Sequence, residues 1–240
     1  MSGLAQSITQ HPIRTSLKWS LLALLGLVLA YQIFLFSHVL LYRFINPSST
    51  AFMRAQAAEL DNKTIQYIWV DYENISASLK KAVIASEDSG FKQHSGVEWL
   101  AIRHAFMFNL KQWRKGKERM RGGSTISQQL AKNLFLSENR SYWRKAQELV
   151  ITYMLEWTMP KKRILELYLN TAQFGETVFG AEAASQFYFK KSSKQLNNHE
   201  ASRLAVLLPN PRYYGQHIKG AYVSGRASII RQRMRQVSPP

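Results

Sequence analysis

Two adjacent carboxylates, Glu87 and Asp88, have the residue type and setting for acid–base chemistry. They follow a segment with helical apolar spacing over 77–85 and precede Ser89 and Gly90, which predicts a helix end beside a turn. Neighbouring residues on a helix point in different directions, so one carboxylate can face a cleft while the other makes structural hydrogen bonds. A carboxylate in a partly apolar cleft has a raised pKa and can act as a base near neutral pH. The alternative is a solvated helix end.

A second group of polar residues follows a glycine turn at 122–123. In the helix predicted after this turn, one face is apolar and the other carries Thr125, Gln128, Gln129 and Lys132. Free N–H groups at the helix start, together with these hydroxyl, amide and ammonium groups, could bind an anion. The segment is not a P-loop, because it lacks the Gly-Lys-Ser/Thr order. An ordinary helix cap is the alternative.

A third group, Arg140, Arg144, Lys145 and Glu148, places cations beside a carboxylate. Arg144 and Glu148 are four residues apart on a predicted helix. Such pairs are usually ion pairs on a helix surface and contribute about 0.3–0.5 kcal/mol. A surface ion pair is therefore the simplest interpretation of this group taken alone.

The secondary structure that must position these groups is predicted to be mainly α-helical. One strand is predicted at 65–70 from its β-branched and aromatic residues. Helices are predicted after a Ser76 cap, over 126–134, over 142–158, from Pro160, after an Asn197–Glu200 capping box and over the basic segment 220–236. The polar stripe on the helix after Pro160 is expected to be structural, and it consists of Lys161, Glu166 and Asn170.

Near its amino terminus the chain has a segment that is apolar enough to cross a membrane. Residues 19–42 include no charged side chain, and about 20 helical residues span the hydrocarbon layer. A cleaved signal peptide would have a shorter apolar centre of about 7–15 residues and a small-residue cleavage pattern, neither of which we find. Arg14 and Lys18 face Arg43 and Arg54 across the segment. This weak bias leads us to expect the short amino-terminal tail on the cytoplasmic side.

The 240-residue chain carries 32 Lys and Arg against 15 Asp and Glu, a formal net charge of +17. This charge favours an anionic partner, whether nucleic acid, membrane surface or phosphorylated substrate. The segment 103–121 mixes basic and aromatic residues, which suits an anionic membrane interface, and a solvated basic face is the alternative. The absence of cysteine excludes disulfides, thiolate zinc sites and a cysteine nucleophile. No pair among the six histidines has metal-ligand spacing.

Taken in chain order, these groups resemble the five motifs of the family 51 peptidoglycan glycosyltransferases. The matching segments are 87–96 (E-D-x-x-F-x-x-H-x-G), 123–133 (G-S-T-I-x-Q-Q-x-x-K-N), 144–148 (R-K-x-x-E), 161–170 with Gly175 and Gly180, and 184–211. With one anchor and no room for a transpeptidase domain, the chain resembles the monofunctional biosynthetic transglycosylases. These are related to the transglycosylase domain of class A penicillin-binding proteins.

The resemblance implies a lysozyme-like α lobe with a small membrane-associated jaw lobe, preceded by one transmembrane helix. The corresponding boundaries are a cytoplasmic tail at 1–16, a transmembrane helix at 17–42, a linker at 43–70 and a glycosyltransferase domain at 71–236. It also implies a single-pass protein of the bacterial inner membrane with its catalytic domain on the periplasmic side. We expect the fold and the chemistry to survive deletion of residues 1–45.

The reaction implied by the resemblance is polymerisation of lipid II into β-1,4-linked glycan strands, with inversion at the donor sugar and release of undecaprenyl diphosphate. Its partners would be lipid II, the growing lipid-linked strand, membrane lipid and cell-wall synthesis or division proteins, with no nucleic acid. Glu87 matches the family's catalytic base and Glu148 its second catalytic carboxylate. The resemblance implies that no cofactor is required. Glu148 would either orient nearby cations or hold a divalent ion such as Mg²⁺ against the diphosphate.

The motifs also assign the side chains around these carboxylates. Those implied to bind substrate are Ser124, Thr125, Gln128, Gln129, Lys132, Asn133, Arg140, Arg144 and Lys145. Those expected to support the site are Asp88, Phe91, His94, Gly96 and Asn170. Two positions depart from the family pattern, which has Arg at His104 and Gly at Lys190. The first bears on which cation contacts the donor phosphates, and the second on whether a tight turn exists at 190.

Two other functions are consistent with some of these residues. A lysozyme-like hydrolase would share the helical fold and the catalytic Glu but would transfer the sugar to water. A basic, membrane-tethered scaffold would grip anionic lipid or nucleic acid through 103–121 and would not need Glu87.

Overall fold

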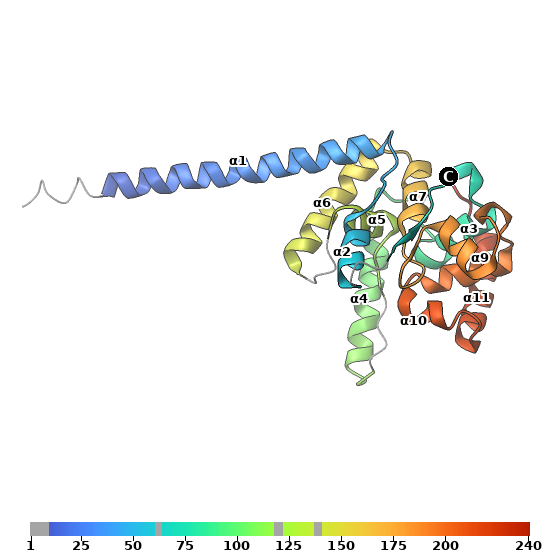
Figure 1. Cartoon of the computed structure of the whole chain (residues 1–240). Coiled ribbons are helices and arrows are strands. Elements are labelled where there is room, and N and C mark those ends of the chain that lie inside the picture. Colours follow the sequence, from blue (N-terminus) through green and yellow to red (C-terminus); the bar gives the residue numbers. More distant parts are fainter. Residues whose placement is uncertain (1–9, 61–63, 118–121, 137–140) are drawn as a thin grey trace, which may run out of the picture.

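The computed structural model describes residues 10–60, 64–117, 122–136 and 141–240, with side chains from residue 16 onward. Two helices extend from a helical body in different directions, α1 (Gln10–Tyr42) as a long rod and α4 (Trp99–Trp113) as a shorter projection (Figure 1). The other helices and strands are α2 (Ala51–Glu59), β1 (Gln66–Tyr67), α3 (Ala77–Glu87), α5 (Ile126–Phe135), α6 (Tyr142–Thr158), α7 (Lys161–Thr171), β2 (Val178–Phe179), α8 (Ala181–Phe189), α9 (Asn198–Leu207), α10 (Pro211–Gln216) and α11 (Ala221–Arg233). Three 3-10 turns are η1 (Tyr72–Asn74), η2 (Ser193–Gln195) and η3 (Met234–Gln236).

Several helices begin where their capping residues predict. The Ser76 hydroxyl accepts the Leu79 N–H at 3.0 Å at the start of α3, and Asn197 and Glu200 form a capping box on α9. Pro160 immediately precedes α7. The predicted mainly α-helical fold is therefore confirmed, and the basic helix near the carboxyl end is α11.

The strand predicted at 65–70 is wrong in its length, because β1 holds only two residues, which pair in parallel with β2. Beyond it, the side chain of Asn170 occupies the backbone groups that a longer strand would use. Its amide bonds both the N–H and the C=O of Val70 at 2.9 Å. The extended segment is thus held by a side chain instead of by a neighbouring strand.

Two sets of packed helices hold the core around the predicted chemical groups. On one side α3 packs against α9 and α11, and on the other α5 packs against α6 and α7. Leu79 and Val83 of α3, Leu130 of α5 and Leu155 of α6 are inaccessible to solvent. Because α3 ends at Glu87 and α5 begins at Ile126, this packing brings the first two groups together.

The span Ser16–Tyr42 of α1 is long and apolar enough to cross a membrane and is compatible with a single-pass anchor. Its carboxyl-terminal half also belongs to the body, since Leu35 and Val39 are buried in the main hydrophobic core. Deleting residues 1–45 would remove these two side chains from the core. The anchor is therefore not separable from the fold in the way that the sequence suggests.

Candidate active site

Glu87 ends α3 and lines a cavity of about 640 Å³ together with Ser86, Ser124 and Gln129. The Gln129 amide donates to one carboxylate oxygen at 3.0 Å, and the Ser86 hydroxyl donates to the other at 3.1 Å. Both donors are neutral. Among the described residues, the carboxylate is therefore held by oriented hydrogen bonds without a directly bonded cation.

Burial raises the pKa of the Glu87 carboxyl above its usual range, because desolvation disfavours the ionised form. The hydrogen bonds from Gln129 and Ser86 and the positive charge of Arg226 act in the opposite direction, while the neighbouring Asp88 raises it further. The result is a carboxyl group that can take up a proton closer to neutral pH than an exposed glutamate, as a general base requires.

A buried tyrosine orients the amide that bonds Glu87. The Tyr168 hydroxyl of α7 donates to Gln129 Oε1 at 2.9 Å, so the Nε2 end of the same amide faces Glu87. Tyr168 is almost fully buried, and burial raises its pKa well above the usual value, which keeps the hydroxyl protonated as a donor. Tyr168, Gln129 and Glu87 thus form a chain of directed hydrogen bonds.

Asp88 turns away from Glu87 and joins α3 to the start of α5. Its buried carboxylate accepts the Ile126 N–H at 2.9 Å and contacts His94 Nε2 at 2.9 Å. The Gly96 N–H donates to His94 Nδ1 at 3.1 Å, which leaves the ring proton on Nε2, directed at Asp88. Asp88 and His94 therefore hold the loop after α3 against α5.

Three further support positions also have structural contacts. Phe91 is fully buried, with Lys161 Nζ 4.6 Å from its ring centroid. Gly96 has φ +93°, and a Cβ there would lie 2.8 Å from Thr152 Cγ2, so only glycine fits. Asn170 supports the segment at Val70, and no described contact joins it to Glu87.

Glu148 lies on α6 with its charge balanced by two cations. Arg144 Nη1 donates to one oxygen at 2.9 Å, and Lys145 Nζ donates to the other. Lys145 Nζ also contacts the Ser124 hydroxyl at 3.4 Å. Since Ser124 lines the cavity that contains Glu87, it connects the cationic group to the base. Arg140, the fourth predicted member, lies outside the described residues.

The side chains predicted on 124–133 divide between the cavity and the helix itself. Among these predicted side chains, Ser124 and Gln129 line the cavity. Thr125 and Gln128 are buried in a reciprocal capping box at the start of α5, which is the alternative noted from the sequence. Their predicted role in binding therefore has no support from this geometry.

The other two predicted binding residues of α5 lie away from the cavity lining. Asn133 is buried. Lys132 Nζ is 5.4 Å from the centroid of the Phe52 ring in α2. Both positions stay predictions as substrate contacts.

The surroundings of Glu148 do not resemble a ready metal site. Mg²⁺ is usually bound by one or two carboxylates together with substrate phosphates and water. Here both oxygens of Glu148 face cations. Within the described ranges, three potential ligands come together only at Asp88, His94 and Glu98, and the Asp88 carboxylate already bonds Ile126 and His94.

Several groups around Glu87 were not predicted from the sequence. Arg226 and Tyr222 of α11 and Tyr214 of α10 line the same cavity, and the two tyrosine rings stack at 5.2 Å. The sequence signalled a basic helix in this region, but no spacing indicated that it faces Glu87. The sequence likewise showed no sign that Tyr168 contacts Gln129.

The two departures from the family pattern have different structural settings. Lys190 directly follows α8 as its C-cap and has φ +59° and ψ +35°, the left-handed conformation that glycine adopts most easily. The tight turn therefore exists despite the lysine. His104 and its neighbour Arg103 are both exposed on α4.

Comparison with known proteins places the chain beside one kind of enzyme. A family profile described as Transglycosylase matches residues 54–235. The biosynthetic peptidoglycan transglycosylase of Bordetella pertussis is 50% identical over 224 residues, covering 92% of this chain and 93% of that protein. The protein of the same name from Herminiimonas arsenicoxydans is 49% identical over 232 residues, covering 95% and 99%. That from Laribacter hongkongensis is 46% identical over 231 residues, covering 93% and 100%.

Proposed function

The chain belongs to the transglycosylase family and is a peptidoglycan glycosyltransferase that polymerises glycan strands from lipid II, and on this premise we propose that Glu87 is its catalytic base. The observation that supports the assignment is the position of this carboxyl in the 640 Å³ cavity, with burial raising its pKa. An acceptor sugar hydroxyl is a poor nucleophile. A base within hydrogen-bond reach activates it by taking its proton.

In the proposed step, the acceptor hydroxyl oxygen attacks the anomeric carbon of the donor while its proton moves to Glu87. The bond between that carbon and the diphosphate oxygen breaks, and the lipid diphosphate leaves as an anion. Gln129 and Ser86 hold the carboxylate in place for the transfer. Attack from the face opposite the leaving group gives inversion and a β-1,4 linkage.

The departing diphosphate needs positive charge more than it needs a proton. Arg144 and Lys145 supply that charge in the proposal, and Ser124 connects them to the cavity of Glu87. Within the described part of the chain, Arg144 Nε is a buried donor that makes no hydrogen bond. Arg226, which lies on the cavity wall, provides a further cation.

Glu148 has the role of orienting these two cations in this proposal. Its contacts with Arg144 and Lys145 support that role over divalent-ion binding, since a metal ion would have to displace two bonded cations. If Mg²⁺ did bind with the substrate, Glu148 and the diphosphate oxygens would hold it, and it would neutralise leaving-group charge.

The location proposed for the enzyme is the bacterial inner membrane, with α1 as a single-pass anchor and the catalytic body on the periplasmic side. The apolar span Ser16–Tyr42 supports the anchor. The orientation rests on the weak charge bias around that span. It also rests on the expected position of the lipid-linked substrate at the periplasmic surface of the inner membrane.

Replacing Glu87 with glutamine tests the assignment. Glu87→Gln keeps the size and hydrogen-bonding shape of the side chain but cannot take up the proton. We expect lipid II polymerisation to fall by about 10²–10⁴-fold, the contribution typical of a general base, while lipid II binding is largely retained. The rate is measured by following the conversion of labelled lipid II into glycan strands. Binding is measured by equilibrium titration with lipid II.

Glu73→Gln is the matched control, because Glu73 is an exposed glutamate that pairs with Lys162 away from the cavity. It should leave polymerisation unchanged. Wild-type rates in Glu87→Gln would contradict the assignment of the base. Loss of binding together with rate would instead indicate a positioning role.

A further inference from the structure

The carboxyl-terminal half of α1 has one covered face. Its exposure falls at Gln32, Leu35, Phe36, Val39 and Tyr42, while most intervening residues are exposed. The spacing of three and four residues places these side chains in one stripe along the helix. Much of this stripe lies against α6, which is beside the near end of α1 in Figure 1.

The contacts along this stripe include a reciprocal pair of amides. Gln32 Nε2 donates to Gln147 Oε1 at 2.9 Å, and Gln147 Nε2 donates back to Gln32 Oε1 at 3.1 Å. Farther along, Phe36 stacks on Trp157 with 5.7 Å between ring centroids. The Arg43 guanidinium donates to the Thr158 carbonyl at 2.8 Å. These contacts follow the same order along α1 and α6.

The length of α1 fixes the depth of this contact in a membrane. The free part of the apolar span, Ser16–Tyr31, is about 24 Å long at 1.5 Å per residue. A hydrocarbon layer is about 30 Å thick. A helix that begins its crossing at Ser16 is therefore still inside the layer when it reaches Gln32, and tilting the helix would only carry Gln32 deeper.

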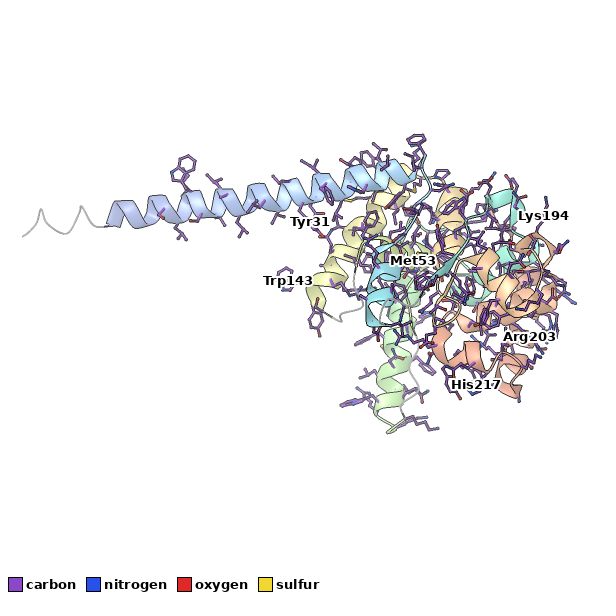
Figure 2. All side chains as sticks on the ribbon, in the orientation of Figure 1. Tyr31, Met53, Trp143, Lys194, Arg203 and His217 are labelled. Atoms are coloured by element: carbon purple, nitrogen blue, oxygen red, sulfur yellow. The ribbon has the colours of Figure 1, made fainter. Side chains whose placement is uncertain are left out.

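Aromatic side chains of α6 project on the same side of the body as α1. Trp143 is 87% exposed and Trp157 is 81% exposed, and Tyr142 is almost entirely uncovered. Figure 2 shows Trp143 reaching out from α6 on the side toward which α1 extends, whereas Lys194 lies at the far end of the body. Tryptophan and tyrosine are the residues most enriched at the membrane–water interface.

We propose that the exposed face of α6, with Tyr142, Trp143 and Trp157, is inserted in the membrane interface beside α1, and that the Gln32–Gln147 pair holds it there. The occupant of this surface is the lipid bilayer. The proposal rests on the proposed crossing of α1. It differs from the expectation at 103–121, because it assigns the contact to the helix that carries Glu148.

The amide pair suits this position for a physical reason. A single glutamine facing hydrocarbon would leave its donors and acceptor unsatisfied, whereas two facing amides satisfy each other and join the helices. Gln147 is also the neighbour of Glu148 in the sequence. The anchor is thereby connected directly to the helix that presents Arg144 and Lys145.

Spin labelling tests the surface, because the chain has no native cysteine. Trp143→Cys and, as a control, Lys194→Cys would each carry a nitroxide in full-length protein. The samples are vesicles of phosphatidylethanolamine and phosphatidylglycerol. Collision with oxygen, which partitions into lipid, is compared with collision with a water-soluble nickel complex.

We expect the label at 143 to collide mainly with oxygen and the label at 194 mainly with nickel. A label at 143 that is as accessible to nickel as the label at 194 would overturn the proposal. Polymerisation by wild-type protein in the same vesicles is scored separately. If the enzyme polymerises lipid II but position 143 is exposed to water, only the proposal that α6 contacts the membrane is wrong. If position 143 lies in lipid but the enzyme does not polymerise lipid II, only the proposed function is wrong.

A second pair of variants tests the amide clamp in the Trp143→Cys background. Gln32→Leu removes one partner of Gln147. Ser37→Leu makes a similar polar-to-apolar change on the exposed face of α1, where the serine hydroxyl donates to the Ile33 carbonyl of its own helix. Gln32→Leu should lower the ratio of oxygen to nickel collisions for the label at 143, toward the ratio found for the label at 194. Ser37→Leu should leave that ratio unchanged. Equal ratios in the two variants would refute the clamp.

Discussion

Glu87 and Glu148 are two carboxylates that the protein surrounds with opposite kinds of partner. Glu87 is held by the neutral side chains of Gln129 and Ser86, and burial raises its pKa. Glu148 is buried and is bonded to Arg144 and Lys145. A base must accept a proton near neutral pH, whereas a carboxylate that organises cations acts only while it is ionised. Their surroundings, more than their residue type, separate the two roles.

The largest expected contrast lies between activity and stability in Glu87→Gln. Because burial raises its folded-state pKa, the stability that the protonated carboxyl contributes is present below the unfolded-state pKa and is lost as pH rises through the folded-state pKa. Glutamine has no such loss. The inactive variant should therefore melt at the same temperature as wild type in acid and at a higher temperature at neutral pH. Thermal unfolding at both pH values measures this, and a lower melting temperature at neutral pH would contradict it.

Glu148→Gln should have the opposite effect on stability. It leaves the positive charges of Arg144 and Lys145 without their carboxylate, and we expect unfolding free energy to fall by about 2 kcal/mol. Polymerisation should fall by about 100-fold, because the cations lose their orientation toward the leaving group. Denaturant unfolding and lipid II assays on Glu148→Gln and Glu87→Gln together check the comparison. Equal stability changes in the two variants would show that their surroundings are not different in kind.

Tyr168→Phe tests whether neutral hydrogen bonds hold Glu87 ready. Without the hydroxyl, the Gln129 amide is free to turn, so the carboxylate loses a donor that lowers its pKa. The acidic limb of the pH–rate profile should move to higher pH, and kcat/KM near neutral pH should fall about fivefold, equivalent to a bond of about 1 kcal/mol. Asp88 and Arg226, the charged groups facing Glu87, are unchanged.

Tyr188→Phe is the control for Tyr168→Phe, since the Tyr188 hydroxyl donates to the Phe174 carbonyl at 2.9 Å, away from Glu87. It removes a comparable hydrogen bond and should not move the acidic limb. If both variants or neither variant shifts the profile, the hydrogen-bond chain does not position the base.

The smallest expected effect lies outside both carboxylate sites. Lys190→Gly relieves a left-handed conformation that costs a residue with a Cβ about 1 kcal/mol. Part of this gain is offset by the greater freedom of glycine in the unfolded chain. Unfolding free energy should rise by less than about 1 kcal/mol with polymerisation unchanged. A destabilised Lys190→Gly variant would mean that the lysine side chain, 5.9 Å from the Phe187 ring centroid, matters more than the strain.

Local sequence signals predicted much of the fold and little of the geometry around the base. Ser76, Asn197 and Glu200 act within three or four residues of their partners, so their caps could be recognised from spacing. The capping role of Thr125 and Gln128 was an open alternative, because the same residue types can bind an anion or start a helix. In this structure the two side chains cap the helix. The Thr125 hydroxyl also donates to the Gly96 carbonyl, which holds the neighbouring loop against the helix start.

The sequence by itself determined that the chain is mainly helical, that it has an apolar span near its start, and which carboxylates and cations follow one another along it. Only the tertiary structure brought Tyr168 to Gln129, Arg226 to the cavity of Glu87 and Gln147 to Gln32. These partners are far apart in sequence, by 39 residues in the first case and 115 in the last. The pattern that forms a helix repeats within a few residues, whereas a contact between helices depends on how whole apolar faces pack together.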